Sequence, residues 1–217
     1  WNQFLGPQRN GTSAETNLID TWPASGPKIV WRTPLGVSMS GVALANGAAF
    51  TMFQDDASQI VVCLNAADGK ERWRTAVAPM YENAMGHGPR ATPTVADGHV
   101  FAFTGEGILA ALKLDDGKLL WSVDVPKLLK GTPNEYGVSC SPLVADGLVV
   151  VHSGTSSAAV AAFKVADGKL AWQVGKGNAG YSSPALMKLA GETQIVSLTA
   201  AGAMGIEPAT GKPLWSF

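Results

Sequence analysis

A short motif that recurs along the chain constrains this sequence more than any other feature. Each copy places a glycine in a turn and a tryptophan four residues after it, and successive motif tryptophans are 48, 51 and 43 residues apart. A further tryptophan stands 42 residues before the first copy, so that the column consists of Trp31, Trp73, Trp121, Trp172 and Trp215. Periods in the forties fit one four-stranded blade of a β-propeller per repeat. The repeat therefore predicts an all-β propeller of four-stranded antiparallel blades.

Two other columns of the repeat support this interpretation. The position five residues before each glycine is large and apolar, and the one before it is small: Leu64, Leu112, Phe163 and Ile206 follow Cys63, Ala111, Ala162 and Gly205. A small residue leaves room for an indole from an adjacent strand or blade, and a buried aromatic ring removes roughly 150–250 Å² from water. We therefore expect the tryptophans to dock blades together, in preference to stacking on a substrate.

Short turns and long connections are expected on opposite faces of the propeller. Asp-Gly, Asn-Gly and Thr-Gly pairs between apolar runs predict tight hairpins, which join the first strand to the second and the third to the outer strand. The links between blades lie on the other face and are long, at residues 78–91, 126–140 and 175–181. Because long loops on a rigid scaffold are where binding usually resides, we expect a protein or small-molecule ligand on the long-loop face.

The strand count indicates a part of a larger ring. We divide the chain into an N-terminal extended segment (1–27), an outer strand of the closing blade (28–33) and four blades (34–76, 77–124, 125–174 and 175–217). The strand at 28–33 lacks its three partners, so the remaining blades of the same propeller are expected elsewhere. The alternative is a closed four-bladed ring with the surplus strand docked loosely.

Composition excludes several classes of function. The net charge is −1 and no basic run occurs, so nothing predicts nucleic-acid binding. No apolar stretch approaches the roughly 18 residues that a membrane-spanning helix needs. Cys63 and Cys140 are 77 residues apart, which makes no disulfide framework.

At these columns the sequence resembles the PQQ-like (quinoprotein alcohol dehydrogenase-like) β-propeller repeat superfamily. The resemblance rests on the Ala-Leu to Asp-Gly-Lys to Trp unit at residues 111–121, and the opening WNQFLGPQRNG at 1–11 is similar to the start of secreted bacterial members. It covers essentially the whole chain. It implies a larger ring, of eight blades in the dehydrogenases, and an extracytoplasmic (periplasmic or secreted) location.

Two branches of this superfamily imply different functions. Its dehydrogenases hold PQQ and Ca²⁺ on the ring axis under an adjacent Cys-Cys disulfide, and this sequence has neither that pair nor a Cys-x-x-Cys-His haem motif. The other branch, such as an outer-membrane assembly lipoprotein, scaffolds protein partners without catalysis. We therefore expect a non-enzymatic scaffold with no cofactor. The alternatives are a fragment of a PQQ- and Ca-dependent dehydrogenase of alcohols or sugars, and a sensor domain attached to another module.

Candidate binding residues gather in the link before the second blade. Glu82 and Asn83 are residue types that Ca²⁺ accepts, His87 can titrate near neutral pH, and Arg90 can clamp a carboxylate. A single Glu-Asn pair falls short of the six to eight oxygens that calcium takes. A solvated loop whose course is set by glycine and proline is the alternative, and no residue is singled out as catalytic or as a metal ligand.

A second group of candidates precedes the innermost strands of the later blades. Tyr136, Ser139, Tyr181 and Ser182, followed by Ser183, carry hydroxyl groups near the lip of the central channel. These hydroxyls are expected either to line a ligand funnel or to satisfy the polar groups of buried strand ends.

Overall fold

The computed structural model describes residues 1–131, 134–155, 158–178 and 180–217, and its strands form four separate four-stranded sheets. In each sheet four consecutive strands lie side by side in chain order and pair antiparallel. The first sheet comprises β1 (Ala43–Ala45), β2 (Ala48–Gln54), β3 (Ser58–Asn65) and β4 (Glu71–Pro79), and the second β5 (Thr94–Ala96), β6 (His99–Phe103), β7 (Ile108–Lys113) and β8 (Leu119–Asp124). The third comprises β9 (Leu143–Ala145), β10 (Leu148–Thr155), β11 (Ala158–Lys164) and β12 (Leu170–Val174), and the fourth β13 (Ala185–Leu189), β14 (Glu192–Thr199), β15 (Gly202–Ile206) and β16 (Pro213–Ser216).

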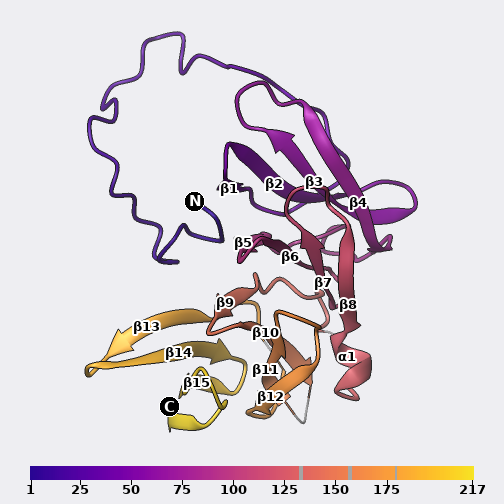
Figure 1. The fold of residues 1–217 in the computed structure, drawn as a ribbon, viewed down its shortest axis with the longest axis vertical. Helices are drawn as coiled ribbons and strands as arrows, with labels where there is room; N and C mark the ends of the chain where they lie inside the picture. Colours follow the sequence, from indigo (N-terminus) through magenta and orange to yellow (C-terminus); the bar gives the residue numbers. More distant parts are fainter. Residues whose placement is uncertain (132–133, 156–157, 179) are drawn as a thin grey trace.

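The sheets follow one another along an arc, as the blades of a propeller do (Figure 1). The first strand of each sheet contacts the first strand of the next, so that β1, β5, β9 and β13 line the inner side of the arc. The fourth sheet does not return to the first, and the closed four-bladed ring is therefore not formed. The prediction of a partial propeller with four-stranded blades is confirmed.

Tight turns join the first two strands of every sheet. In the first three sheets these turns are Asn46-Gly47, Asp97-Gly98 and Asp146-Gly147, and both residues of each have positive φ. Such turns match the right-handed twist of the strands that they connect. The fourth sheet uses Ala190-Gly191 with the same backbone, φ 51° and 86°, which the sequence analysis missed because alanine is not a residue expected there.

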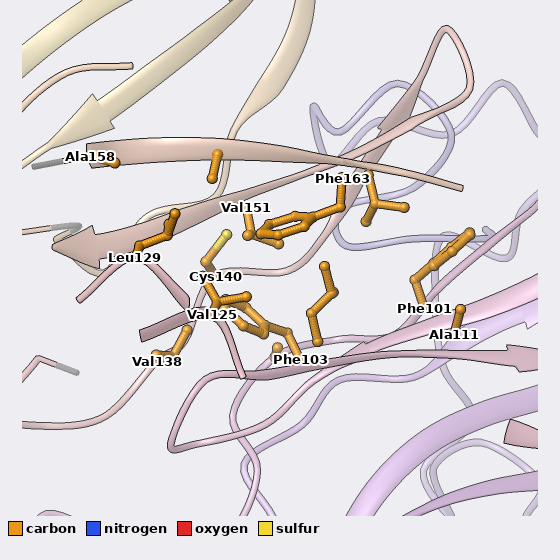
Figure 2. Packing of buried hydrophobic residues seen from close by; sticks show 14 residues of the cluster. Phe101, Phe103, Ala111, Val125, Leu129, Val138, Cys140, Val151, Ala158 and Phe163 are labelled. Atoms are coloured by element: carbon orange, nitrogen blue, oxygen red, sulfur yellow. The ribbon is translucent and has the colours of Figure 1, made fainter. Parts of the chain in front are cut away.

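The hydrophobic core lies between neighbouring sheets. Figure 2 shows the cluster between the second and third sheets, where Phe101 and Phe103 of β6 face Val151 and Phe163 of the next sheet. All four side chains are fully buried. Each sheet therefore buries its faces against its neighbours, which is why a propeller blade needs a partner on both sides.

A single helical turn closes one side of this cluster. In α1 (Val125–Leu128), the side chain of Asp124 accepts a hydrogen bond from the Lys127 amide at 2.9 Å and caps the first turn. Val125 and Leu129 are buried in the core (Figure 2). The sequence predicted only a link at this position. In the described part of the chain no helix has the length and apolarity to cross a bilayer.

Trp73, Trp121 and Trp172 each connect their own sheet to the next. Each of them lies opposite the small residue of the third strand of its own sheet, as Trp121 lies opposite Ala111. The indole N–H of each then donates to a carbonyl of the following sheet, at 2.8 Å from Trp121 to Val165 O. The corresponding bonds run from Trp31 to Ala66 O, from Trp73 to Leu114 O and from Trp172 to Pro208 O, at 2.9, 3.1 and 3.0 Å.

The turn glycine of the next sheet is part of the same contact. A Cβ added at Gly168, whose φ is +70°, would stand 2.7 Å from the Trp121 ring. We expect Gly168→Ala to lower the free energy of unfolding by about 2 kcal/mol more than Gly147→Ala, because overpacking adds to the strain of the left-handed backbone. Gly147 is the matched control, since its φ is +72° and nothing lies within 4 Å of an added Cβ. Urea denaturation measures both values, and equal losses of unfolding free energy in the two variants would contradict a tight contact between Gly168 and Trp121.

The structure assigns no strand to residues 28–33, which the sequence analysis predicted to be an outer strand with its three partners in further blades. No described part of the chain offers this segment a ladder partner, so the prediction stays untested. The segment nevertheless docks as an outer strand does: Thr33 Oγ1 donates to Gly69 O at 2.8 Å, and Thr75 of β4 makes the same bond to Gly117 O at 2.6 Å. The contacts of an outer strand are thus present, whereas its sheet pairing is not.

Candidate functional site

Three long connections join the successive sheets. They span residues 80–93, 125–142 and 175–184, and each leads from an outer strand back to the innermost strand of the next blade. We call the surface that the described residues of these connections form the link face. It is the surface on which the sequence analysis placed its candidate residues.

Hydrogen bonds join the three connections to one another. Asn83 Nδ2 in the first donates to Glu135 O in the second at 2.8 Å. Ser139 Oγ in the second donates to Tyr181 O in the third at 3.1 Å. The candidate residues of both sequence clusters therefore belong to one continuous surface.

All three tyrosines of the chain lie on the link face, together with Arg90. The Arg90 guanidinium stands over the Tyr81 ring at 4.9 Å from its centroid, and the Tyr136 and Tyr181 rings stack with their centroids 5.7 Å apart. Tyr136 is 42% exposed and Tyr181 is 50% exposed. We call these four residues the Tyr-Arg patch. Partial burial lowers the pKa of Arg90, while Tyr81 and Tyr181 act in the opposite direction.

Tyr81 holds the patch in place, although the sequence analysis did not choose it as a candidate. Its ring packs against Gly105 of the second sheet's hairpin and its hydroxyl against Gly137 of the next connection, where an added Cβ would collide with it. The signal that would have found it is that each connection contains one of the chain's three tyrosines.

Arg90 is fixed from two sides. Its Nη1 and Nη2 atoms donate to Gly88 O and Gly86 O, each at 2.7 Å, while its flat face covers Tyr81. The sequence analysis proposed that Arg90 clamps a carboxylate. In this arrangement its N–H groups mainly hold the loop, and the aromatic stacking is what it presents to the link face.

The candidate calcium ligands do not form a cation site. Asn83 Oδ1 accepts from Met85 N at 2.9 Å, so its oxygen is engaged in the loop, and Asn83 N donates to the His87 ring at 3.2 Å. Glu82 is exposed. Among the described residues no group of three His, Cys, Asp or Glu side chains is placed to hold a metal ion. Because Ca²⁺ takes six to eight oxygens, the residues of this loop do not fit it.

The serine candidates are engaged in the protein's own structure. Ser139 bonds to Tyr181 O as described, and Ser182 Oγ donates to Leu198 O at 2.6 Å. Ser183 Oγ accepts from Ser141 N at 2.9 Å, just as Ser141 Oγ accepts from Thr92 N at 2.9 Å one blade earlier. The hydroxyl before each of these inner-strand prolines thus links one blade to the previous one. Of the two roles considered for these serines, the contacts are those of satisfied strand ends.

Comparison with known proteins places the chain in a family. The family model described as outer membrane protein assembly factor BamB matches residues 17–129 and 57–217. The chain belongs to this family. BamB of Yersinia pestis is 30% identical over 187 residues, which cover 78% of this chain and 43% of that protein. The chain therefore spans less than half the length of this BamB.

Solved structures share the fold of this BamB-family chain. BamB from Moraxella catarrhalis superposes with a TM-score of 0.63 at 16% identity, over 90% of this chain and 56% of that one. Quinohemoprotein alcohol dehydrogenase from Comamonas testosteroni gives a TM-score of 0.61 at 18% identity, over 82% and 34%. At these identities the similarity shows a common propeller architecture, and the resemblance to the PQQ-like repeat superfamily is confirmed.

Proposed function

We propose that this chain is part of a non-enzymatic propeller scaffold in the periplasm, which binds a protein partner through its link face. Family membership supports the class of function, because the matching family model and the Yersinia pestis relative are named outer membrane protein assembly factor BamB. The observation that carries the choice of surface is the Tyr-Arg patch. The partner we expect is another protein of the outer-membrane assembly machinery.

The composition of the patch is that of a protein-binding hot spot. Tyrosine and arginine are enriched where a few residues supply most of the binding energy. Tyr136 and Tyr181 are exposed, yet their mutual stacking already holds the rings, so that binding costs little side-chain entropy. Arg90 and Tyr81 extend the same surface with a second, partly buried pair.

Site-specific photo-crosslinking in cells tests this surface. We expect p-benzoylphenylalanine at position 136 or 181 to cross-link to one defined partner protein, because an aromatic group at these exposed positions would lie in the interface. The control is the same label at Ala166, which is exposed in a turn between β11 and β12. Cross-linking to that partner from position 166 alone would reject the link face.

Alanine substitution of the stacked pair measures its contribution. We expect Tyr181→Ala to weaken binding of the cross-linked partner at least tenfold, since truncation of a hot-spot residue costs about 2 kcal/mol or more. The matched control, Gln173→Ala on the exposed side of β12, should leave the affinity unchanged. Isothermal titration with the purified partner gives both values, and an unchanged Kd for Tyr181→Ala would argue against the patch.

The alternative of a PQQ- and Ca-dependent dehydrogenase is supported by the common fold and by a shorter sequence match, 35% identity over 83 residues, to the dehydrogenase subunit of a quinone alcohol dehydrogenase. Its loop candidates Glu82 and Asn83 do not gather the ligands that calcium requires. Dye-linked oxidation of an alcohol or sugar by the whole protein, after addition of PQQ and Ca²⁺, would overturn the non-enzymatic proposal.

We also propose that further blades of the same propeller cover the fourth sheet. Trp215 occupies the docking column but is 37% exposed, and its indole N–H bonds to Gln194 Oε1 of its own sheet. Leu186 and Met187 of β13 are exposed as well. The corresponding tryptophans Trp73 and Trp172, which have a following sheet, are each 8% exposed.

A further inference from the structure

We propose that Arg9 anchors a carboxylate-binding site in the cleft between the N-terminal segment and the innermost strands β9 and β13. This site lies apart from the Tyr-Arg patch and does not depend on the function proposed above. It rests on the path of the N-terminal segment, on the burial of Arg9 without a counter-charge, and on the residues that line the cleft.

The N-terminal residues run along the inner side of the arc (Figure 1). Trp1 O accepts from Leu44 N of β1 at 2.8 Å, and Asn2 O accepts from Val95 N of β5 at 2.8 Å. These bonds place the segment against the first two sheets, from which it continues to the third. The opening motif that the sequence analysis noted only as a similarity therefore has a defined place near the propeller axis.

This course of the N-terminal segment places the Arg9 side chain in the interior. Its Nη2 atom donates to Ser141 O, next to β9, at 2.9 Å, and only 8% of the residue is exposed. Its Nε and Nη1 atoms are buried and have no hydrogen-bond partner. Burial lowers the pKa of Arg9 to about 10, Cys140 acts in the opposite direction, and no carboxylate among the described residues acts on it. An arginine keeps its charge at neutral pH, so a buried cation is left with one carbonyl as partner.

The cleft beside Arg9 has the character of an anion site. It encloses about 720 Å³ between the N-terminal segment and the two inner strands. Arg9 and Lys188 supply positive charge, and no Asp or Glu is among the described residues that line it. The side-chain amides of Gln3 and Asn10 also line the cleft, where they donate to Pro7 O and Gln8 Oε1 at 2.9 and 3.2 Å. Pairing with an anion would relieve the cost of the buried guanidinium and strengthen its hydrogen bonds.

The rest of the lining selects among anions. Leu143 of β9 and Leu186, Met187 and Leu189 of β13 give the cleft an apolar wall. A carboxylate on a hydrocarbon body matches both parts, whereas inorganic phosphate or sulfate would leave the apolar wall unused. Two sources supply this chemistry: a free small carboxylic acid, or an Asp or Glu side chain of a polypeptide, including a further blade of the same protein.

Thermal unfolding with glutarate tests the first source. If the ligand is a free carboxylate, we expect glutarate at tenfold excess over its Kd to raise the midpoint temperature of unfolding by about 3 °C. Glutaramide with sodium chloride at matched ionic strength should give no shift. Arg9→Gln should abolish the shift. Because Arg9→Gln also removes a buried contact, a second variant, Lys188→Gln, is needed. It should raise the apparent Kd for glutarate about threefold. The control Lys28→Gln, which changes an exposed lysine outside the cleft, should leave that Kd unchanged.

Carbodiimide cross-linking of the R9K variant of the whole protein tests the second source. The reagent activates a carboxylate, and the amine introduced at position 9 then forms an amide bond with it and displaces the urea by-product. Mass spectrometry of the digest would identify the Asp or Glu that lies against position 9 and the polypeptide that carries it. The same treatment of the wild-type protein should give no product at this position.

The two experiments distinguish a free carboxylate from a polypeptide carboxylate, and together they can disprove the site. Glutarate protection that depends on Arg9 assigns the cleft to a free carboxylate. A cross-link at position 9 without glutarate protection assigns it to a polypeptide carboxylate. The proposal is overturned if glutarate gives no protection to either the wild-type protein or the Lys188→Gln variant and the R9K variant yields no cross-link.

Discussion

Replacing Trp73 by alanine is expected to lower the free energy of unfolding by about 3–5 kcal/mol, the range for large aromatic residues in a core. Trp73 is 8% exposed, lies in the core between the first and second sheets, and donates its indole N–H to Leu114 O at 3.1 Å. Its ring also covers Gly117 of the next turn. The substitution therefore leaves a cavity and an unpaired carbonyl in the junction between two blades. Urea denaturation of the 217-residue chain, followed by circular dichroism, measures the loss.

Trp215 provides the matched control for this experiment. It stands in the same column of the repeat, yet it is 37% exposed and bonds within its own sheet to Gln194. We expect Trp215→Ala to cost less than half as much as Trp73→Ala in this chain. If both substitutions cost the same, the stability of the column comes from packing inside each sheet and not from docking between sheets.

The architecture was predictable because each blade repeats the same physical requirement. Trp73, Trp121 and Trp172 each need a small residue opposite them and a glycine turn in the next sheet, so these residue types recur at one spacing. A column of this kind is visible in a single sequence. It indicates the number of blades in the chain before any contact is known.

Two features of the structure are not given by the local pattern alone. Residues 28–33 have the pattern of an outer strand, but a strand needs a neighbour with free N–H and C=O groups, and the sequence analysis expected those partners in further blades, so this prediction stays untested. The turn at Ala190-Gly191 was missed for a different reason. The register of β13 and β14 imposes its backbone, although alanine has no preference for it.

The candidate site was predictable as a surface but not in its details. The length of the connections was sufficient to select the link face, and it placed Tyr136, Tyr181 and Arg90 on it. The role of Tyr81 was hidden because its contacts, Gly105 and Gly137, come from two other parts of the chain. The burial of Arg9 was hidden for the same reason, since its partner Ser141 is 132 residues away.

The stability of the protein is expected to fall as the pH is lowered from 6.5 toward 4, because of one buried histidine. His152 of β10 is fully buried, and its Nε2 atom lies 2.7 Å from Ser197 Oγ of the fourth sheet. Burial lowers the pKa of His152 to about 4, the cation of Arg9 acts in the same direction, and the backbone of Ser182 opposes both. The thiol of Cys140, which accepts from His152 N at 3.3 Å, stays protonated because burial raises its pKa to about 11.

The sign of the effect follows from which state binds the proton. In the unfolded chain a histidine has a pKa near 6.5, so below that pH the unfolded state takes up a proton that the native state refuses. The contribution of His152 to the free energy of unfolding is therefore fully present above pH 6.5 and declines as the pH falls toward 4. Below pH 4 His152 is protonated in both states. One pKa unit corresponds to about 1.4 kcal/mol, so the full contribution is at most about 3 kcal/mol.

Urea denaturation at intervals between pH 7 and pH 4 measures this dependence. His152→Gln retains a side chain that can hydrogen-bond to Ser197 but does not titrate. Between pH 7 and pH 4 we therefore expect this variant to lose less unfolding free energy than the wild-type protein, with a difference of up to about 3 kcal/mol. His87→Gln, at an exposed position of the link face, should retain the wild-type dependence. A wild-type slope that persists in the His152→Gln variant would show that other groups carry the acid sensitivity. A slope that disappears with His152 alone would show that the junction between the third and fourth sheets requires this imidazole to stay neutral.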